Sequence, residues 1–175
     1  ARPVPVGSFA YCCRPLLRAS SLREALTTGF GFYRLVLSDF SPHLRVSGDV
    51  AHVHLAVHAP ANGSLHYAMR SFTFLSFGLM SWLVGRRIAL RHVQFPDGPS
   101  SSGVDVARMF HAPLNYGERC AGYSFDARWL DLPVVRDAQA LREFLRQAPA
   151  NLLVSYRDPA RLNERIRALL KQHLD

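Results

Sequence analysis

The chain has 175 residues, which is enough for one domain with a sizeable buried core. Apolar residues make up 49% of the sequence and charged residues 19%, and this composition excludes an intrinsically disordered chain. The formal net charge is +8, but Lys171 is the single lysine among 21 basic residues, and the arginines are scattered along the chain. That scatter favours an arginine-rich proteome over a surface specialised for nucleic acid or membrane.

The cysteines and the apolar stretches indicate the cellular compartment in which the protein is expected. Cys12, Cys13 and Cys120 make an odd number without framework spacing, which argues against a secreted disulfide scaffold. The longest apolar stretch, residues 72–84, is too short and too interrupted by serine to span a bilayer. With no signal peptide visible, we expect a cytoplasmic protein without a membrane segment.

The first forty residues predict an extended piece and then a helix. Residues 2–11 contain prolines and are typical of an extended, strand-like segment. Ser21 and Glu24 have the spacing of a capping box, in which each side chain accepts from the other residue's backbone amide. We expect the helix to run from there to about Leu37 and to be ended by Pro42.

A hairpin and a long helix are expected next. Residues 43–47 and 51–58 alternate in polarity around a tight turn at Gly48, which predicts two antiparallel strands. Ser64 can cap a helix over residues 65–84, with Gly85 closing it. From Phe74 onward this helix is apolar nearly all round, so we expect it to be the central buried helix.

The second half predicts shorter elements. Residues 88–95 indicate a strand. Residues 102–105 resemble a helix cap and open a short helix to about His111, and residues 113–116 and 121–125 are two short extended pieces. Asp137 is placed to cap a further helix, and Asp158 followed by Pro159 begins an amphipathic one. The fold class is therefore α+β, with a small and mainly antiparallel sheet and helices packed on it.

Five stretches together resemble the sensing domain of AraC/XylS-type transcription regulators, the domain labelled arabinose-binding-like, and in particular the ornithine-utilisation type. They are Pro-Val-Gly-Ser-Phe-Ala-Tyr at 5–11, residues 27–37 with Phe-Tyr-Arg-Leu, Leu-Asp-Leu-Pro at 130–133, Ala-Pro-Ala-Asn-Leu-Leu-Val-Ser-Tyr-Arg at 148–157, and Leu-Asn-Glu-Arg-Ile-Arg-Ala-Leu-Leu at 162–170. The resemblance covers nearly the whole chain, and the order and spacing of the stretches carry it.

The resemblance implies a division of the protein. Residues 1–157 would form a ligand-sensing domain, and residues 158–175 a helix leading into a helix-turn-helix domain that is absent from this chain and binds DNA. The lack of an initial Met agrees with a fragment. The founding arabinose sensor has a cupin-like sensing domain, whereas the long apolar helix here predicts a different fold. Sugar binding is therefore not carried over to this chain.

Two enzyme-like arrangements are present in the sequence. His52, His54 and His58 share one face of a predicted strand and could bind a metal, but a solvent-facing polar side explains them as well. Cys120 and His111 could form a nucleophile and base, but neither lies in a signature context. We therefore expect no catalysis, no metal and no cofactor.

A binding pocket is predicted along the long helix. His66, Arg70 and Thr73 form a polar row on a helix otherwise rich in aromatic residues, although an ordinary core helix would show the same pattern. An arginine in such a pocket could hold a ligand carboxylate with two hydrogen bonds. The candidate ligand-binding residues are Tyr67, Arg70, Phe74, Tyr33, His92, Tyr116 and Trp82.

The sequence thus predicts the effector-sensing part of a transcription regulator. It would bind an unknown small molecule, reach DNA through the missing domain, and could form a homodimer. Effector binding would favour one conformation of the domain and so change its orientation or dimerisation. The alternative is a small-molecule-binding protein with no role at DNA.

Overall fold

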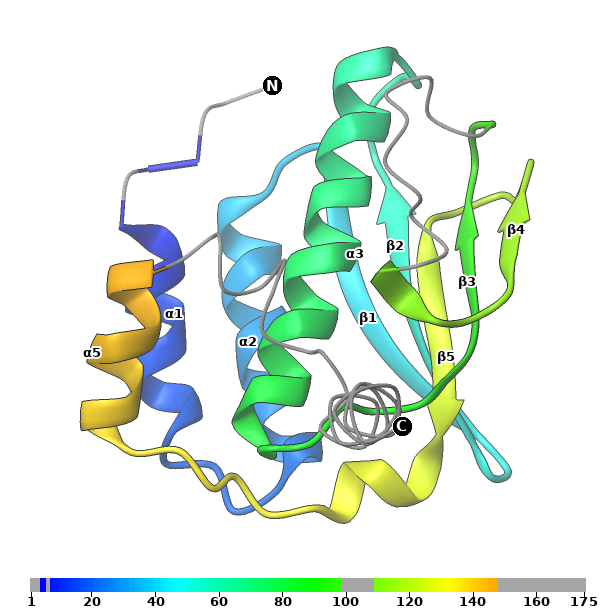
Figure 1. Ribbon diagram of the computed structural model, residues 1–175. Helices are drawn as coiled ribbons and strands as arrows, with labels where there is room; N and C mark the ends of the chain where they lie inside the picture. The colour runs from blue at the N-terminus through cyan, green and yellow to red at the C-terminus, as the bar shows by residue number, and fades with distance from the viewer. Residues whose placement is uncertain (1–3, 6, 99–108, 148–175) are drawn as a thin grey trace, which may run out of the picture.

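The computed structural model describes residues 4–5, 7–98 and 109–147, and these form a sheet with helices on one side (Figure 1). The helices are α1 (Ser8–Leu16), α2 (Leu22–Val36), α3 (Gly63–Leu83), the 3₁₀ helix η1 (Ala127–Asp131) and α5 (Ala138–Gln147). The strands are β1 (Phe40–Ser47), β2 (Val50–Val57), β3 (Leu90–Phe95), β4 (Leu114–Tyr116) and β5 (Gly122–Asp126). The prediction of an α+β domain with a long central helix is confirmed.

The sheet has the strand order β1-β2-β5-β3-β4. Every pairing is antiparallel except that of β3 with β4, so the expected mainly antiparallel sheet is confirmed. On β2, Ala51, Val53 and Leu55 are buried toward the helices, while His52 and His54 lie on the opposite face. This alternation is the period-two pattern of a half-buried strand.

Three layers build the core. Figure 1 shows α1 and α5 lying outside α2 and α3, which in turn lie on the sheet. One apolar cluster joins α2 and α3 to the sheet, with Phe30, Met80 and Tyr123 among its buried members. A second cluster joins the outer helices to α2 and α3, with Cys13 and Phe144 among its buried members.

The prediction of an extended segment at residues 2–11 is wrong from Ser8 onward. Gly7 adopts a left-handed conformation with φ 89°, and α1 begins at the next residue. Cys12, Cys13 and Leu16 then face the core, which is the spacing of a helix and not of a strand. Pro5, which precedes the helix, suggested an extended piece that does not continue.

The ends of α2 and α3 differ in detail from the predictions. Ser21 caps α2 by accepting from the Glu24 amide, but the Glu24 carboxylate accepts from Ser20 instead of Ser21. Asn62, not Ser64, caps α3, and its side-chain oxygen accepts from the Leu65 amide at 2.8 Å. Gly85 follows α3 with φ 66°, as expected for a glycine that closes a helix.

Pro42 does not end α2, because that helix already ends at Val36. Pro42 lies inside β1 instead, opposite Leu55 of β2. β1 pairs with β2 alone, so it is an edge strand, where a residue without an amide donor is tolerated.

Two predictions fall partly or wholly outside the described residues. Of the short helix expected from the cap at 102–105 to about His111, residues 109–111 are described: Met109 and Phe110 are helical, and His111 lies in a turn with φ 51°. The helix expected over 158–175, and with it the boundary at residue 157, lies outside the described residues. Within the described part, no helix is long and apolar enough to cross a membrane.

Candidate functional site

A cavity of about 570 Å³ lies between α1, α2 and α3. Phe9 and Cys12 of α1 line it, together with Gly29 of α2 and Leu75 and Leu79 of α3. Its volume is within the roughly 300–1,000 Å³ that is usual for small-molecule sites. The cavity is therefore large enough for a metabolite.

Small side chains make room for the cavity. Ala25 and Gly29 are one turn apart on α2, and Ala68 and Ser71 of α3 line the same cavity. A Cβ added at Gly29 would lie 3.5 Å from Leu16 Cδ2 of α1, which is ordinary contact. Because these positions carry little or no side chain, the three helices pack without filling the space between them.

The described residues that line the cavity include no Asp, Glu, Lys, Arg or His. Burial raises the pKa of the Cys12 thiol to about 11, so this group stays protonated and neutral at pH 7. Burial also raises the pKa of the Tyr33 hydroxyl. The described wall is therefore uncharged, and its polar side-chain groups are hydroxyls and the Cys12 thiol.

The hydroxyls differ in how far they are already used. Ser76 donates to the Thr73 carbonyl and accepts from the Tyr123 hydroxyl, so it is satisfied within the fold. The side chains of Tyr33, Ser71 and Tyr67 make no hydrogen bond with another residue of the described part, and Tyr67 is 74% exposed. Tyr33 and Ser71 are therefore the unused hydroxyls inside the cavity, and the Tyr67 hydroxyl is a third at its exposed end.

Two of the seven residues predicted from the sequence line this cavity. Tyr67 is 74% exposed and lies at its open end, together with Val4. Tyr33 lies deeper, and its ring meets Phe72 edge to face at 5.0 Å between centroids. The structure therefore brings Tyr67 and Tyr33 to one site.

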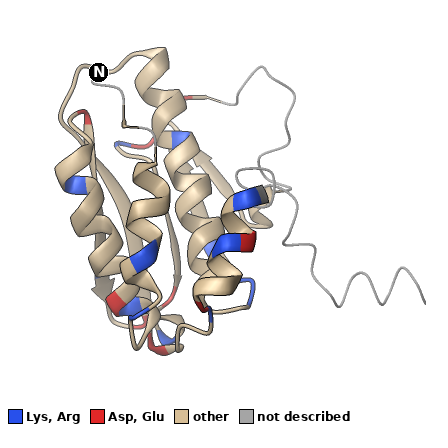
Figure 2. Ribbon diagram, turned by 90° about the vertical axis from the view of Figure 1, so that its left-hand side faces the viewer, with Lys and Arg blue, Asp and Glu red and all other residues tan. Residues whose placement is uncertain are grey.

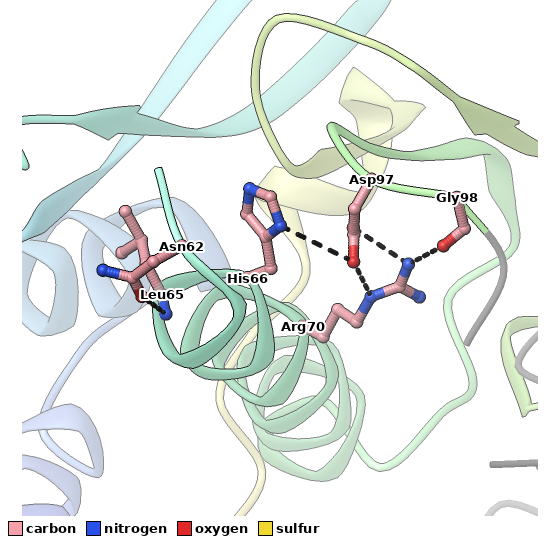
Figure 3. A network of polar contacts seen from close by, with 6 residues as sticks. All are labelled: Asn62, Leu65, His66, Arg70, Asp97 and Gly98. Carbon is pink, nitrogen blue, oxygen red and sulfur yellow. Dashed lines mark hydrogen bonds and ion pairs between the residues drawn. The ribbon is translucent and has the colours of Figure 1, made fainter. Parts of the chain in front are cut away.

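Arg70 and Tyr116 lie together, away from the cavity. Arg70 Nε donates to Asp97 Oδ2 at 3.1 Å, and Nη2 donates to the Gly98 carbonyl (Figure 3). Arg70 Nη2 also forms an ion pair with Asp97 Oδ1 at 2.9 Å, although that oxygen makes no aligned hydrogen bond. The guanidinium stacks over Phe95 at 4.5 Å and lies 5.8 Å from the Tyr116 ring. Arg70 thus ties α3 to the end of β3.

The other three predicted residues are dispersed. The ring of Phe74 meets Phe110 edge to face at 5.9 Å. Trp82 stacks on Phe144 of α5 at 4.4 Å. His92 lies on the outer face of the sheet, where its Nδ1 is 2.8 Å from the Ser124 hydroxyl. None of the three lines the cavity.

The histidines of the outer sheet face form contacts with one another. His54 stacks on His43 of β1 at 5.2 Å, and Ser41 Oγ lies 2.8 Å from a ring nitrogen of both His43 and His58. Burial, followed by nearby arginines and histidines, lowers the pKa of His43 and of His54. Among the described residues, no group of three His, Cys, Asp or Glu side chains is arranged to hold a metal ion.

The small residues that make the cavity are not among the site residues predicted from the sequence. Ala25 and Gly29 have helical i, i+4 spacing, and that signal was available in the sequence. By itself, however, a glycine inside a helix indicates only a lower helix stability. Which helix packs against that face is a tertiary fact that the spacing does not contain.

The fold and the cavity define an α+β domain whose helical layers enclose an uncharged space. Residues 1–134 match the family model described as the arabinose-binding domain of AraC transcription regulators, N-terminal. The chain belongs to that family, which confirms the resemblance seen in the sequence.

One solved structure has the same fold over most of the chain. It is the transcriptional regulator CdpR from Pseudomonas aeruginosa, with 12% sequence identity and a TM-score of 0.60. The match covers 78% of this chain and 45% of the CdpR chain, so this chain spans under half of the length of that regulator. A search of curated proteins finds no match.

Proposed function

We propose that the chain is the effector-sensing part of an AraC-type transcription regulator. A small-molecule effector binds in the cavity between α1, α2 and α3, and a helix-turn-helix domain elsewhere in the protein binds DNA. The observation that carries the proposal is the cavity itself, in a domain of this family. In this proposal the chain has no catalytic role and acts in the cytoplasm.

The contacts of α5 support a coupling between the cavity and this helix. Phe144 of α5 contacts Phe9 of α1 at 6.2 Å and Trp82 of α3 at 4.4 Å between ring centroids. Both α1 and α3 line the cavity. A ligand that moves these two helices relative to each other would therefore change the position of α5, the last described helix.

This mechanism is a shift between conformations. An effector that binds one arrangement of α1, α2 and α3 more tightly raises the population of that arrangement. The equilibrium between orientations of the DNA-binding domain, or between monomer and dimer of the regulator, then shifts by the same coupling free energy.

The test uses the full-length gene product and its own upstream DNA in a gel-shift assay. Extracts of the producing cell supply candidate effectors, and an active fraction should change the DNA affinity. Ala68→Trp, which places a large ring at the cavity mouth, should remove the response and keep basal DNA binding. Leu35→Trp is the matched control, since Leu35 is 88% exposed on α2 and does not line the cavity.

A full-length protein that shifts no DNA under any condition would contradict the proposal. It would favour a small-molecule-binding protein without a role at DNA.

A further inference from the structure

The cavity wall is chemically uniform, and this restricts what it can hold. Apart from a few hydroxyls and the Cys12 thiol, the lining side chains are aliphatic or aromatic. Figure 2, which looks from the helical side, shows charged positions scattered singly or in small groups, with uncharged stretches between them. No described charged residue faces the cavity.

A charged ligand group would lose its hydration there without gaining a partner. Transfer of an isolated ion into an apolar site is strongly unfavourable unless a counter-charge or several hydrogen bonds replace the water. The charge nearest in sequence on α3, Arg70, lies outside the cavity and is already paired with Asp97. Amino acids and organic acids buried in this cavity would leave their charges unpaired.

A sugar fits no better, because it carries many hydroxyls. Each buried hydroxyl without a partner costs free energy, and the wall offers only Tyr33 and Ser71 inside and Tyr67 at the exposed end as hydroxyls without a partner among the described residues. A polyhydroxylated ligand therefore has more hydroxyl groups than the cavity wall can hydrogen-bond.

The cavity also has a direction. Its open end includes Val4, Tyr67 and Ala68, all exposed. Its inner wall includes Leu16, Met80 and Leu83, all at most 2% exposed. Ser71 is one helical turn inward from Tyr67, between the two ends.

We infer that the effector is an uncharged and mainly apolar molecule, such as a medium-chain alcohol or ketone, and not a sugar or an amino acid. Its apolar part fills the inner end, and one hydroxyl or carbonyl group faces Tyr33 and Ser71. That this ligand acts as an effector rests on the proposed function, whereas the class of ligand rests on the cavity wall alone.

The test measures ligand binding to the 175-residue chain directly. N-phenyl-1-naphthylamine, an uncharged fluorescent probe, is titrated into the protein and then displaced with 1-decanol, decanoate, L-arabinose and L-arginine. We expect saturable binding of the probe and its displacement by 1-decanol, weaker displacement by decanoate, and none by arabinose or arginine. Ala68→Trp and Ser71→Phe should weaken probe binding by about tenfold or more, and Leu35→Trp should leave it unchanged.

Several results would overturn the inference. They are displacement by arabinose or arginine, decanoate binding more tightly than 1-decanol, and probe binding that both cavity variants leave intact. Thermal melts of the variants establish that each is folded before its affinity is compared.

The two proposals fail separately. Probe binding that responds to the cavity variants, in a full-length protein that shifts no DNA, would refute the regulator role and keep the ligand class. Regulation by a polar effector that Ala68→Trp abolishes would refute the ligand class and keep the regulator role.

Discussion

Trp82, at the end of α3, stacks on Phe144 of α5 with ring centroids 4.4 Å apart and an interplanar angle of 22°. Arg136 lies 5.4 Å from the Trp82 ring, and its Nε donates to the Trp82 carbonyl at 2.6 Å. Phe144 is 5% exposed, so this stack is a buried packing contact between α5 and α3, one of the helices that line the cavity.

Phe144→Ala should lower the free energy of unfolding by about 3 kcal/mol, because it removes a buried aromatic ring and leaves a void. Urea unfolding followed by circular dichroism measures the change. Phe144→Leu should cost less, and Glu143→Ala, at an exposed position on the same helix, should be near neutral. A loss for Phe144→Ala no larger than that of Glu143→Ala would contradict the packing described here.

The Arg70–Asp97 pair gives a second prediction. The side chains of Arg70 and Asp97 are 15% and 28% exposed, so each retains some contact with water. Asp97→Ala leaves the guanidinium without its carboxylate and should destabilise the fold by about 1–3 kcal/mol. Arg70→Met with Asp97→Ala should cost less than the sum of the two single changes, and a double-mutant cycle measures this coupling.

Arg70→Met also tests whether Arg70 contributes to ligand binding in the cavity. Because Arg70 lies outside the cavity, the variant should bind N-phenyl-1-naphthylamine as tightly as the unmodified chain does. A marked loss of probe affinity in a folded Arg70→Met protein would restore Arg70 as a ligand-binding residue.

The sequence predicted the elements well where periodicity and caps are local. The hairpin follows from alternation around Gly48, and α5 begins where Asp137 accepts from the Ala140 amide at 2.7 Å. α1 was missed, because prolines at its start suggested an extended chain before Cys12, Cys13 and Leu16 could be seen to share a face.

The candidate site was harder to predict. Arg70 has the same appearance in sequence whether its partner is a ligand or Asp97, which is 27 residues away. Tyr33 and Tyr67 belong to helices that meet only in the tertiary structure. The aromatic character of α3 was visible in sequence, but the helix face that borders the cavity is decided by packing against α1 and α2.

The histidines on the outer face of the sheet should make the stability of the fold depend on pH. Burial, then Arg45, His43 and His52, lowers the pKa of His54 below its ordinary 6.5 in the folded protein. His43 has a lowered pKa for a similar reason, with Arg34 and His58 among its causes. The unfolded chain therefore binds more protons than the folded chain once the pH falls toward 6.5.

The sign follows from this difference. Stability from these histidines is complete above pH 6.5, falls as the pH drops through 6.5, and levels off below the folded pKa values. Urea unfolding at pH 7.5 and pH 5.5 should give a lower stability at pH 5.5. His54→Gln, which cannot titrate, should reduce that difference, and an unchanged difference would remove His54 as a cause.

Gly122 and Gly63 form a matched pair for a final test of the fold. Gly122 pairs with His54 across β2 and β5, and a Cβ there would overlap the Val53 carbonyl oxygen. Gly122→Ala must therefore separate β5 from β2 and should destabilise the protein by at least about 2 kcal/mol. Gly63 begins α3, and a Cβ there has nothing within 4 Å. Gly63→Ala should be neutral or slightly stabilising, because alanine loses less backbone entropy in a helix. Urea unfolding measures both changes, and equal effects for the two variants would contradict the close approach of β5 to β2 at this position.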